Sequence, residues 1–255
     1  MIEFPAVEPG EPVKVSAGTY VAYLQCPEAA AARLEGHYSP DSVASFRGAL
    51  AHRVFARALG QGPIEPGDLE RVVREEIGIG LNQKMGPLQM KPSKLAPIIE
   101  DVGRLYERFR RFPSDGFAGA EVALDVEPRP GVRLVGKIDA VFVEGGGRKI
   151  VDWKTGELGD PLDQLRFYAL VWALSEGELP VRLEAVSVLT GERLDSVPTA
   201  GDIEKVAAVT AELISSVRRK WRGDKELARL GGPWCRYCPL LSDCPEGRAA
   251  TELTG

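Results

Sequence analysis

The 255-residue chain lacks the features that would place it in a membrane or make it an ATP-driven motor. No apolar run approaches the roughly 18 residues of a transmembrane helix. The N-terminus, MIEFPAVEPGEP, is acidic and proline-rich, without the basic start and apolar stretch of a signal peptide. No GxxxxGK[ST] sequence occurs, so we expect no ATP-binding loop. These absences favour a cytoplasmic protein without a membrane partner.

The chain also has no excess of basic charge, because 32 Lys and Arg residues against 37 Asp and Glu residues give a net charge of −5. The overall charge therefore gives no reason to expect nucleic acid as a partner. Basic residues do gather in RFRRF (108–112) and RRKWR (218–222). Each cluster is equally compatible with a solvated helix face and with phosphate contact.

The order of the expected elements predicts an α/β fold with a mixed central sheet flanked by helices. Apolar residues at helical spacing predict helices over 16–37, 42–60, 94–112, 160–176 and 202–223, and a short helix within 62–80. Alternating apolar and polar residues predict strands over 120–127, 132–144 and 148–155, and either a hairpin or a strand with an irregular partner over 181–197. We expect one domain, 1–255, made of a helical N-terminal part (16–113), a sheet core (119–200) and a C-terminal helix with a cysteine cluster (201–255).

An acidic residue and a lysine lie two positions apart in IVDWKTG, on the third expected strand. Side chains alternate along a strand, so Asp152 and Lys154 point to one face while Val151 and Trp153 point to the other. Charged side chains are costly to bury without a partner. This pair is therefore a poor choice for filling a core, and it predicts a functional site at the end of the strand.

The two preceding strands add Asp139, in LVGKIDAVFV, and Glu121, in EVALDVE. On these residues alone, a structural ion pair between Asp139 and Lys154 remains an alternative. Three carboxylates and one lysine otherwise suit a divalent cation such as Mg²⁺. A bound metal makes its water easier to deprotonate and neutralises charge on a phosphate, and the lysine can orient that water.

The segments GKIDAV, VDWKTG and QLRFY, in this order and spacing, resemble the PD-(D/E)XK nucleases of the RecB-like branch. The resemblance implies a restriction-endonuclease-like fold, with Asp139 and Asp152 as metal ligands, Lys154 as the catalytic lysine and Glu121 as a further acidic residue. It implies that His52, in FRGALAHRVF, is the metal-ligating histidine of a G-x-x-x-H element, which favours Mn²⁺ beside Mg²⁺. It also places two residues that share a helix face, Gln164 and Tyr168, beside the active site.

Three of the four cysteines lie in WCRYCPLLSDC (234–244) as Cys235, Cys238 and Cys244, and the fourth is Cys26. Thiolates suit Zn²⁺ or an iron–sulfur cluster equally on chemistry, and ordinary buried cysteines are the remaining alternative. The pattern resembles RecB-like nucleases, Cas4 proteins among them, that carry an upstream cysteine and a C-terminal triplet. That resemblance implies a structural [4Fe–4S] cluster clasping the two ends of the chain.

The resemblance implies a metal-dependent DNA nuclease, a RecB-like exonuclease acting on DNA ends or single strands. A Cas4-type nuclease in CRISPR spacer acquisition is an alternative, and the expected protein partners are then a helicase or the CRISPR integration proteins. A non-catalytic, cluster-stapled DNA-binding subunit is a second alternative. A zinc-bound protein with a chance D-x-K sequence is the third.

Overall fold

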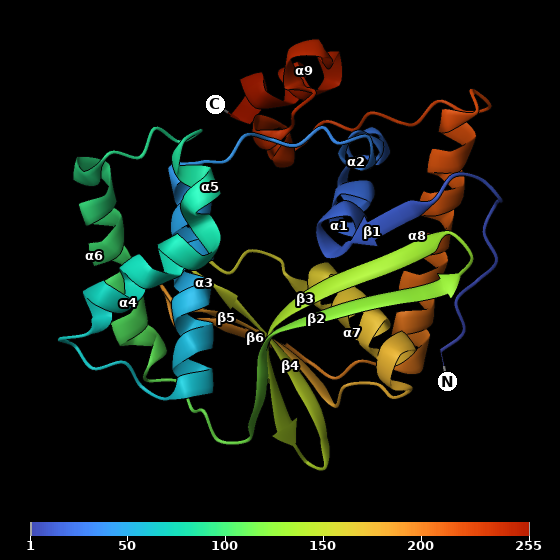
Figure 1. Ribbon diagram of the computed structural model, residues 1–255. Coiled ribbons are helices and arrows are strands. Elements are labelled where there is room, and N and C mark those ends of the chain that lie inside the picture. The colour runs from blue at the N-terminus through green and yellow to red at the C-terminus, as the bar shows by residue number, and fades with distance from the viewer. Residues whose placement is uncertain (1, 255) are drawn as a thin grey trace.

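One mixed sheet of six strands lies at the centre of the protein, with helices on both faces (Figure 1). The computed structural model describes residues 2–254. The strands are β1 (Val13–Ser16), β2 (Phe117–Arg129), β3 (Val132–Glu144), β4 (Gly147–Lys154), β5 (Arg182–Ser187) and β6 (Arg193–Ser196). Strands β2, β3 and β4 form the expected antiparallel meander, whereas β1 runs parallel to β3 and β5 runs parallel to β4.

Strand β3 has a gap along one of its edges. Strand β2 pairs along most of one edge, from Phe117 opposite Phe142 to Arg129 opposite Val132. The other edge is shared, because β1 pairs with residues 132–135 and β4 pairs with residues 140–144. Within the described chain, residues 136–139 therefore have no strand partner on that edge, and this opening lies in the GKID segment.

Alternation along the strands divides the buried residues into two cores, one on each face of the sheet. One core lies under α1 (Ala17–Gln25), α2 (Pro27–Leu34), α7 (Leu162–Glu176) and α8 (Ala200–Trp221). The other lies under α3 (Val43–Gln61), α4 (Leu69–Glu76) and α6 (Pro92–Phe109). Neighbouring residues of β4 separate accordingly, with Ile150 in the first core and Val151 in the second.

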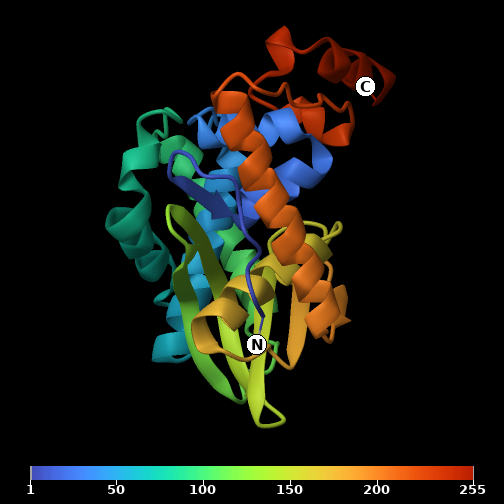
Figure 2. The same ribbon diagram turned by 90° about the vertical axis from the view of Figure 1, so that its right-hand side faces the viewer.

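Shorter segments complete the chain. A π-helix, η1 (Ile77–Leu81), and α5 (Asn82–Met85) follow α4, while two 3₁₀ turns, η2 (Pro233–Tyr237) and η3 (Leu241–Asp243), precede α9 (Pro245–Thr254). Turned by 90°, the molecule shows the N-terminal segment running beside α8 (Figure 2). The buried Arg218 of α8 holds that segment by donating to the carbonyls of Glu8 and Glu11.

The helix starts follow from local sequence. Ser16 accepts a hydrogen bond from the Thr19 backbone and caps α1, and extended Cys26 separates α1 from α2, which begins with Pro27. Helix α3 begins with a reciprocal capping box between Ser42 and Ser45. These caps fix where α1, which precedes Cys26, and α3, which carries His52, begin.

The fold class is confirmed, a mixed sheet flanked by helices, and the differences lie in particular elements. Strand β1 was not expected, because four residues, VKVS, give too short an alternation to separate from a loop. The short helix expected within 62–80 is Leu69–Glu76, and the π-helix that follows it at IGIGL was not expected. The N-terminal helices do not form one layer, since α1 and α2 cover one face and α3, α4 and α6 the other. Among the described residues, no helix is long and apolar enough to cross a membrane.

Candidate active site

Asp139 lies at the gap in the edge of β3, where the ladder with β4 ends. The last backbone pair between the two strands is Ala140 opposite Val151. Beyond it, the Trp153 N–H donates to Oδ2 of Asp139 over 2.8 Å instead of to a backbone carbonyl. This hydrogen bond satisfies a backbone donor and fixes the Asp139 carboxylate at the mouth of the gap.

Glu121 lies on β2 at the position that faces Asp139. Its neighbours pair as Ala120 opposite Ala140 and Val122 opposite Ile138, so Glu121 and Asp139 share a face of the sheet. The backbone φ of Glu121 is +53°, a left-handed conformation that is rare for residues other than glycine, and such strain concentrates at functional sites. The carboxylate pairs with Lys137 of β3.

His52 reaches the same place from α3. Its Nδ1 lies 3.0 Å from Oδ1 of Asp139, and ligand atoms of His52, Glu121 and Asp139 all lie within 4.8 Å of one another. Burial lowers the pKa of His52, but the carboxylates of Asp139, Asp152 and Glu121 outweigh burial and raise it above its ordinary value. The three side chains come from three elements that are far apart in the sequence.

Asp152 and Lys154 share a face of β4, as strand alternation requires. Lys154 Nζ lies 2.8 Å from Oδ2 of Asp152. Gln164 of α7 joins the two residues, because its Nε2 donates to Oδ1 of Asp152 over 2.9 Å and its Oε1 accepts from Lys154 over 2.8 Å. The same Nε2 lies 2.9 Å from the Tyr168 hydroxyl. Val151 and Trp153 pack into the core on the opposite face.

Burial and negative charge together act on the ionisation of these groups. Asp152 is only 3% exposed, and burial, followed by the charge of Asp139, raises its pKa to about 6 despite the neighbouring Lys154. Burial also raises the pKa of Tyr168, assisted by the charge of Asp152. Tyr168 is therefore a neutral hydroxyl at physiological pH, whereas Asp152 titrates close to it.

The donor set fits a hard divalent cation. The Lys154 ammonium approaches Oδ2 of Asp152 outside hydrogen-bond geometry, which leaves this buried oxygen without a hydrogen-bond donor in the described chain. Burying a carboxylate oxygen that accepts no hydrogen bond is costly, and a bound metal cation would add to the partial compensation that the Lys154 ammonium gives. Carboxylate oxygens with one imidazole are ligands that Mg²⁺ and Mn²⁺ accept. The compact group consists of His52, Glu121 and Asp139, and the Asp152 carboxylate contacts Lys154 and Gln164 beside it.

The candidate active site opens into a cavity of about 380 Å³. His52, Glu121, Lys137 and Asp139 line it, together with Gly48, Ala49, Arg53, Gly80 and Leu81. Arg53 and Gly80 pack tightly, since a Cβ on Gly80 would lie 2.4 Å from the Arg53 guanidinium. One wall of the cavity is therefore the π-helix, a rare element that occurs mostly at functional sites.

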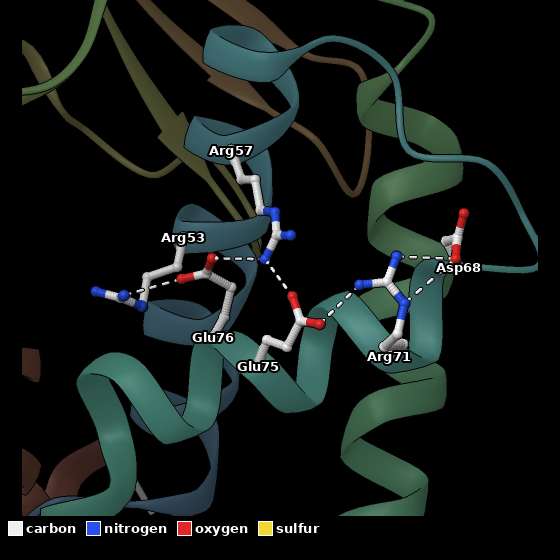
Figure 3. Close-up of polar contacts among 6 residues, drawn as sticks. All are labelled: Arg53, Arg57, Asp68, Arg71, Glu75 and Glu76. Carbon is white, nitrogen blue, oxygen red and sulfur yellow. Dashed lines mark hydrogen bonds and ion pairs between the residues drawn. The ribbon is translucent and has the colours of Figure 1, made fainter.

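A chain of ion pairs fastens that wall to the helix carrying His52 (Figure 3). The nearly buried Glu76 of α4 pairs with Arg53 over 2.8 Å and with Arg57 over 3.4 Å. Arg57 also pairs with Glu75 over 2.8 Å, and Glu75 pairs with Arg71 over 2.7 Å. The sequence analysis did not single out Arg53 or Glu76. The IGIG segment, with two glycines around an isolated apolar residue, was the signal that could have drawn attention to this wall.

The four cysteines come from the two ends of the chain and line one cavity of about 190 Å³. The Cys26 sulfur accepts from the Leu230 N–H over 3.5 Å, Cys235 from Gly232 over 3.4 Å and Cys244 from Gly247 over 3.3 Å. Among residues 2–254, no three cysteine sulfurs lie within 4.8 Å of one another. A tetrahedral zinc site would hold them about 3.8 Å apart, given a Zn–S bond of about 2.3 Å.

Two solved structures align with this chain at low sequence identity, and the first of them shares its fold. A protein of Eubacterium rectale that carries the provisional name of an exonuclease superposes with a TM-score of 0.56 and 14% identity, over 89% of this chain and 86% of that one. The protein named SSO0001 gives a TM-score of 0.39 and 13% identity, over 93% and 88% of the two chains. No curated protein matches the sequence.

The sequence itself matches a family model over nearly its whole length. The matched residues, 14–245, contain every side chain of the active-site group and all four cysteines. They begin in β1 and end at the start of α9. The protein therefore belongs to the PD-(D/E)XK nuclease superfamily.

Proposed function

We propose that the protein is a metal-dependent DNA nuclease, a RecB-like exonuclease that cuts DNA at ends or in single strands. The observation that carries this proposal is the convergence of His52, Glu121 and Asp139 within 4.8 Å. Lys154 stands beside them, linked to Asp152. A non-catalytic DNA-binding subunit would have no reason to keep buried charges in this arrangement, because their burial is costly unless they act.

In this proposal His52, Glu121 and Asp139 hold the metal, with Asp152 beside them. When bound, Mg²⁺ or Mn²⁺ supplies a more acidic water and neutralises charge on the phosphate. Lys154 orients the attacking water and stabilises negative charge on the reacting phosphate. Gln164 positions the Lys154 ammonium and the Asp152 carboxylate relative to each other by hydrogen bonds to both. Tyr168, one turn further along α7, contacts the Gln164 amide.

We also propose that Cys26, Cys235, Cys238 and Cys244 hold a structural [4Fe–4S] cluster. The cavity that all four line favours a group larger than one ion. Each cysteine binds a different iron of such a cluster, so its sulfurs lie farther apart than the ligands of a single zinc. Backbone N–H groups directed at three of the sulfurs suit thiolates in a cluster, where hydrogen bonds to sulfur are usual.

The proposal is tested with protein purified without oxygen and supplied with Mn²⁺ or Mg²⁺. Labelled linear duplex, single-stranded and circular DNA are offered to the wild type, Asp152→Ala and Lys154→Ala. We expect the wild type to degrade linear and single-stranded DNA, to spare covalently closed circular duplex, and both variants to be inactive. Cleavage of none of the substrates by the wild type would refute nuclease function. Degradation of closed circles at the same rate would refute the requirement for ends or single strands.

A further inference from the structure

A second concave site lies next to the catalytic cavity and is lined mainly by arginines. Its volume is about 120 Å³, and a single water needs only about 10–15 Å³ in the same measure, so it can take a group several times larger. Three guanidinium groups reach it, one from α3 and two from α6. The residues that line it include Arg47, Asp101, Arg104, Arg108, Thr155 and Leu189.

The arginines of this site carry more charge than their partners neutralise. Three guanidinium groups and the Asp101 carboxylate line it, and Arg104 also pairs with Glu100 beside it, so the formal balance is 3 − 2 = +1. Asp101 pairs with both Arg104 and Arg47. The Arg47 guanidinium lies 3.6 Å from the Asp101 carboxylate. Arg108 donates to the Leu189 carbonyl, which carries no net charge. The buried Nε of Arg47 has no hydrogen-bond partner within the described residues.

The basic site and the catalytic cavity meet at the end of β4. Thr155, in the basic site, directly follows Lys154, and Arg47 directly precedes Gly48, which lines the catalytic cavity. A Cβ on Gly48 would lie 3.3 Å from Oγ1 of Thr155. Helix α3 and the residue after β4 are therefore in contact here, between the linings of the two sites.

We propose that this basic site binds a backbone phosphate of the DNA strand next to the phosphate that is cut. Guanidinium groups match the planar, paired acceptors of a phosphate better than an ammonium does. The unpartnered Nε of Arg47 and the Thr155 hydroxyl offer further donors from the floor of the site. The inference depends on the proposed nuclease function and adds to it a residue set that positions the strand.

The test compares Arg104→Gln, Arg108→Gln and Asp101→Asn with the wild type. Binding of a fluorescent single-stranded oligonucleotide is measured by anisotropy without activating metal, over a series of NaCl concentrations. We expect each arginine variant to weaken binding several-fold and to lower the slope of log K against log salt by about 0.7, the value for one lost contact to a single strand. Asp101→Asn removes the competing carboxylate, so it should tighten binding.

Arg133→Gln is the matched control, because Arg133 is also a surface arginine paired with an acidic side chain but lies at the start of β3, opposite β1. It should leave affinity and salt slope unchanged, and melting temperatures verify that all variants fold. Unchanged binding in both arginine variants, or weaker binding in a folded Asp101→Asn, would overturn the inference.

A second comparison uses the oligonucleotide with a 5′-hydroxyl and with a 5′-phosphate. If the arginine variants lose affinity only for the phosphorylated form, the site binds a terminal phosphate, and the proposal of a backbone phosphate is overturned. Wild-type cleavage with Mn²⁺ is scored separately, so failure of the nuclease proposal is distinguished from failure of this one.

Discussion

The buried carboxylate of Asp152 is costly for stability and is placed where a bound cation could reduce that cost. Its carboxylate is 3% exposed, faces the negative charge of Asp139 and has one oxygen without a hydrogen-bond donor in the described chain. Lys154 and Gln164 offset part of this cost. A bound cation would therefore stabilise this arrangement relative to the metal-free protein. Buried charges with shifted pKa values are typical of functional sites.

The pKa of Asp152 predicts how metal binding responds to pH. Burial and Asp139 raise this pKa from 3.8 to about 6, and nearby carboxylates raise that of His52. Below pH about 6 both groups hold protons that a metal must displace. The Mn²⁺ affinity, measured by calorimetry, should thus fall by up to about tenfold per pH unit for each proton displaced. Equal affinity at pH 7.5 and pH 5 would contradict these ionisation states.

Gln164 joins the lysine to the carboxylate, so its removal tests whether their alignment matters. Gln164→Ala leaves Lys154 with Asp152 alone and removes the support from Tyr168. We expect kcat to fall about 10- to 100-fold, as for other residues that orient a metal site, with little change in melting temperature. Gln61→Ala, an exposed substitution at the end of α3, is the control. Full activity of Gln164→Ala would show that the clamp is incidental.

At the scale of elements, α4 and the π-helix form a wall whose position depends on ion pairs with α3 (Figure 3). Glu76 is the centre of this network because it contacts both Arg53 and Arg57. Arg53 in turn lines the catalytic cavity and packs on Gly80. The wall and the helix that carries His52 should therefore move together.

Glu76→Ala should destabilise the protein and disturb the cavity. Removing one partner of a nearly buried ion pair costs about 3 kcal/mol, which corresponds to a fall in melting temperature of roughly 5–10 °C for a chain of this size. Glu70→Ala removes only an exposed pair with Arg74 and should cost less than about 0.5 kcal/mol. Differential scanning calorimetry measures both. Equal, small shifts would mean that the network does not brace the wall.

The spacing of apolar residues predicted the helices and strands that bury one face against a core. It did not predict features that depend on strand pairing or on a strained backbone. The meander of β2, β3 and β4 was predictable because each strand alternates between core and solvent or site. Strand β1 forms because β4 leaves part of the edge of β3 free for pairing. This depends on tertiary structure and cannot be read from the local sequence of β1. The left-handed backbone of Glu121 and the Glu76 network depend on neighbours distant in sequence. Asp139, Asp152 and Lys154 could be singled out as candidates because a charged residue on an apolar strand is itself a signal.

At the scale of the whole molecule, the sheet separates two cores, and the interrupted edge of β3 holds the candidate active-site group. Helix α3 reaches the candidate site through His52, and α7 reaches it through Gln164. The C-terminal segment returns to α1 and α2, where Cys26 meets the cavity of the cysteine triplet. A clasp between such distant segments limits the entropy of the open chain.

Cys26→Ser tests whether a metal centre makes that clasp. The variant should lose iron and the brown absorbance of an iron–sulfur cluster, and its melting temperature should fall to that of wild-type protein stripped with a chelator, because both lack the centre. Iron analysis and thermal melts on protein kept free of oxygen provide the readout. One zinc and no iron per wild-type chain would contradict the cluster, and an unchanged melting temperature would contradict its structural role.

The most direct test of the central claim separates metal binding from catalysis at one site. Mn²⁺ binding and single-turnover cleavage of linear DNA are measured together for the wild type, Asp139→Asn and Lys154→Met. Asp139 belongs to the group that converges within 4.8 Å, and Lys154 lies outside it. We predict that Asp139→Asn loses both metal binding and cleavage, whereas Lys154→Met binds Mn²⁺ like the wild type and fails to cut. Wild-type cleavage rates in both variants would contradict the account.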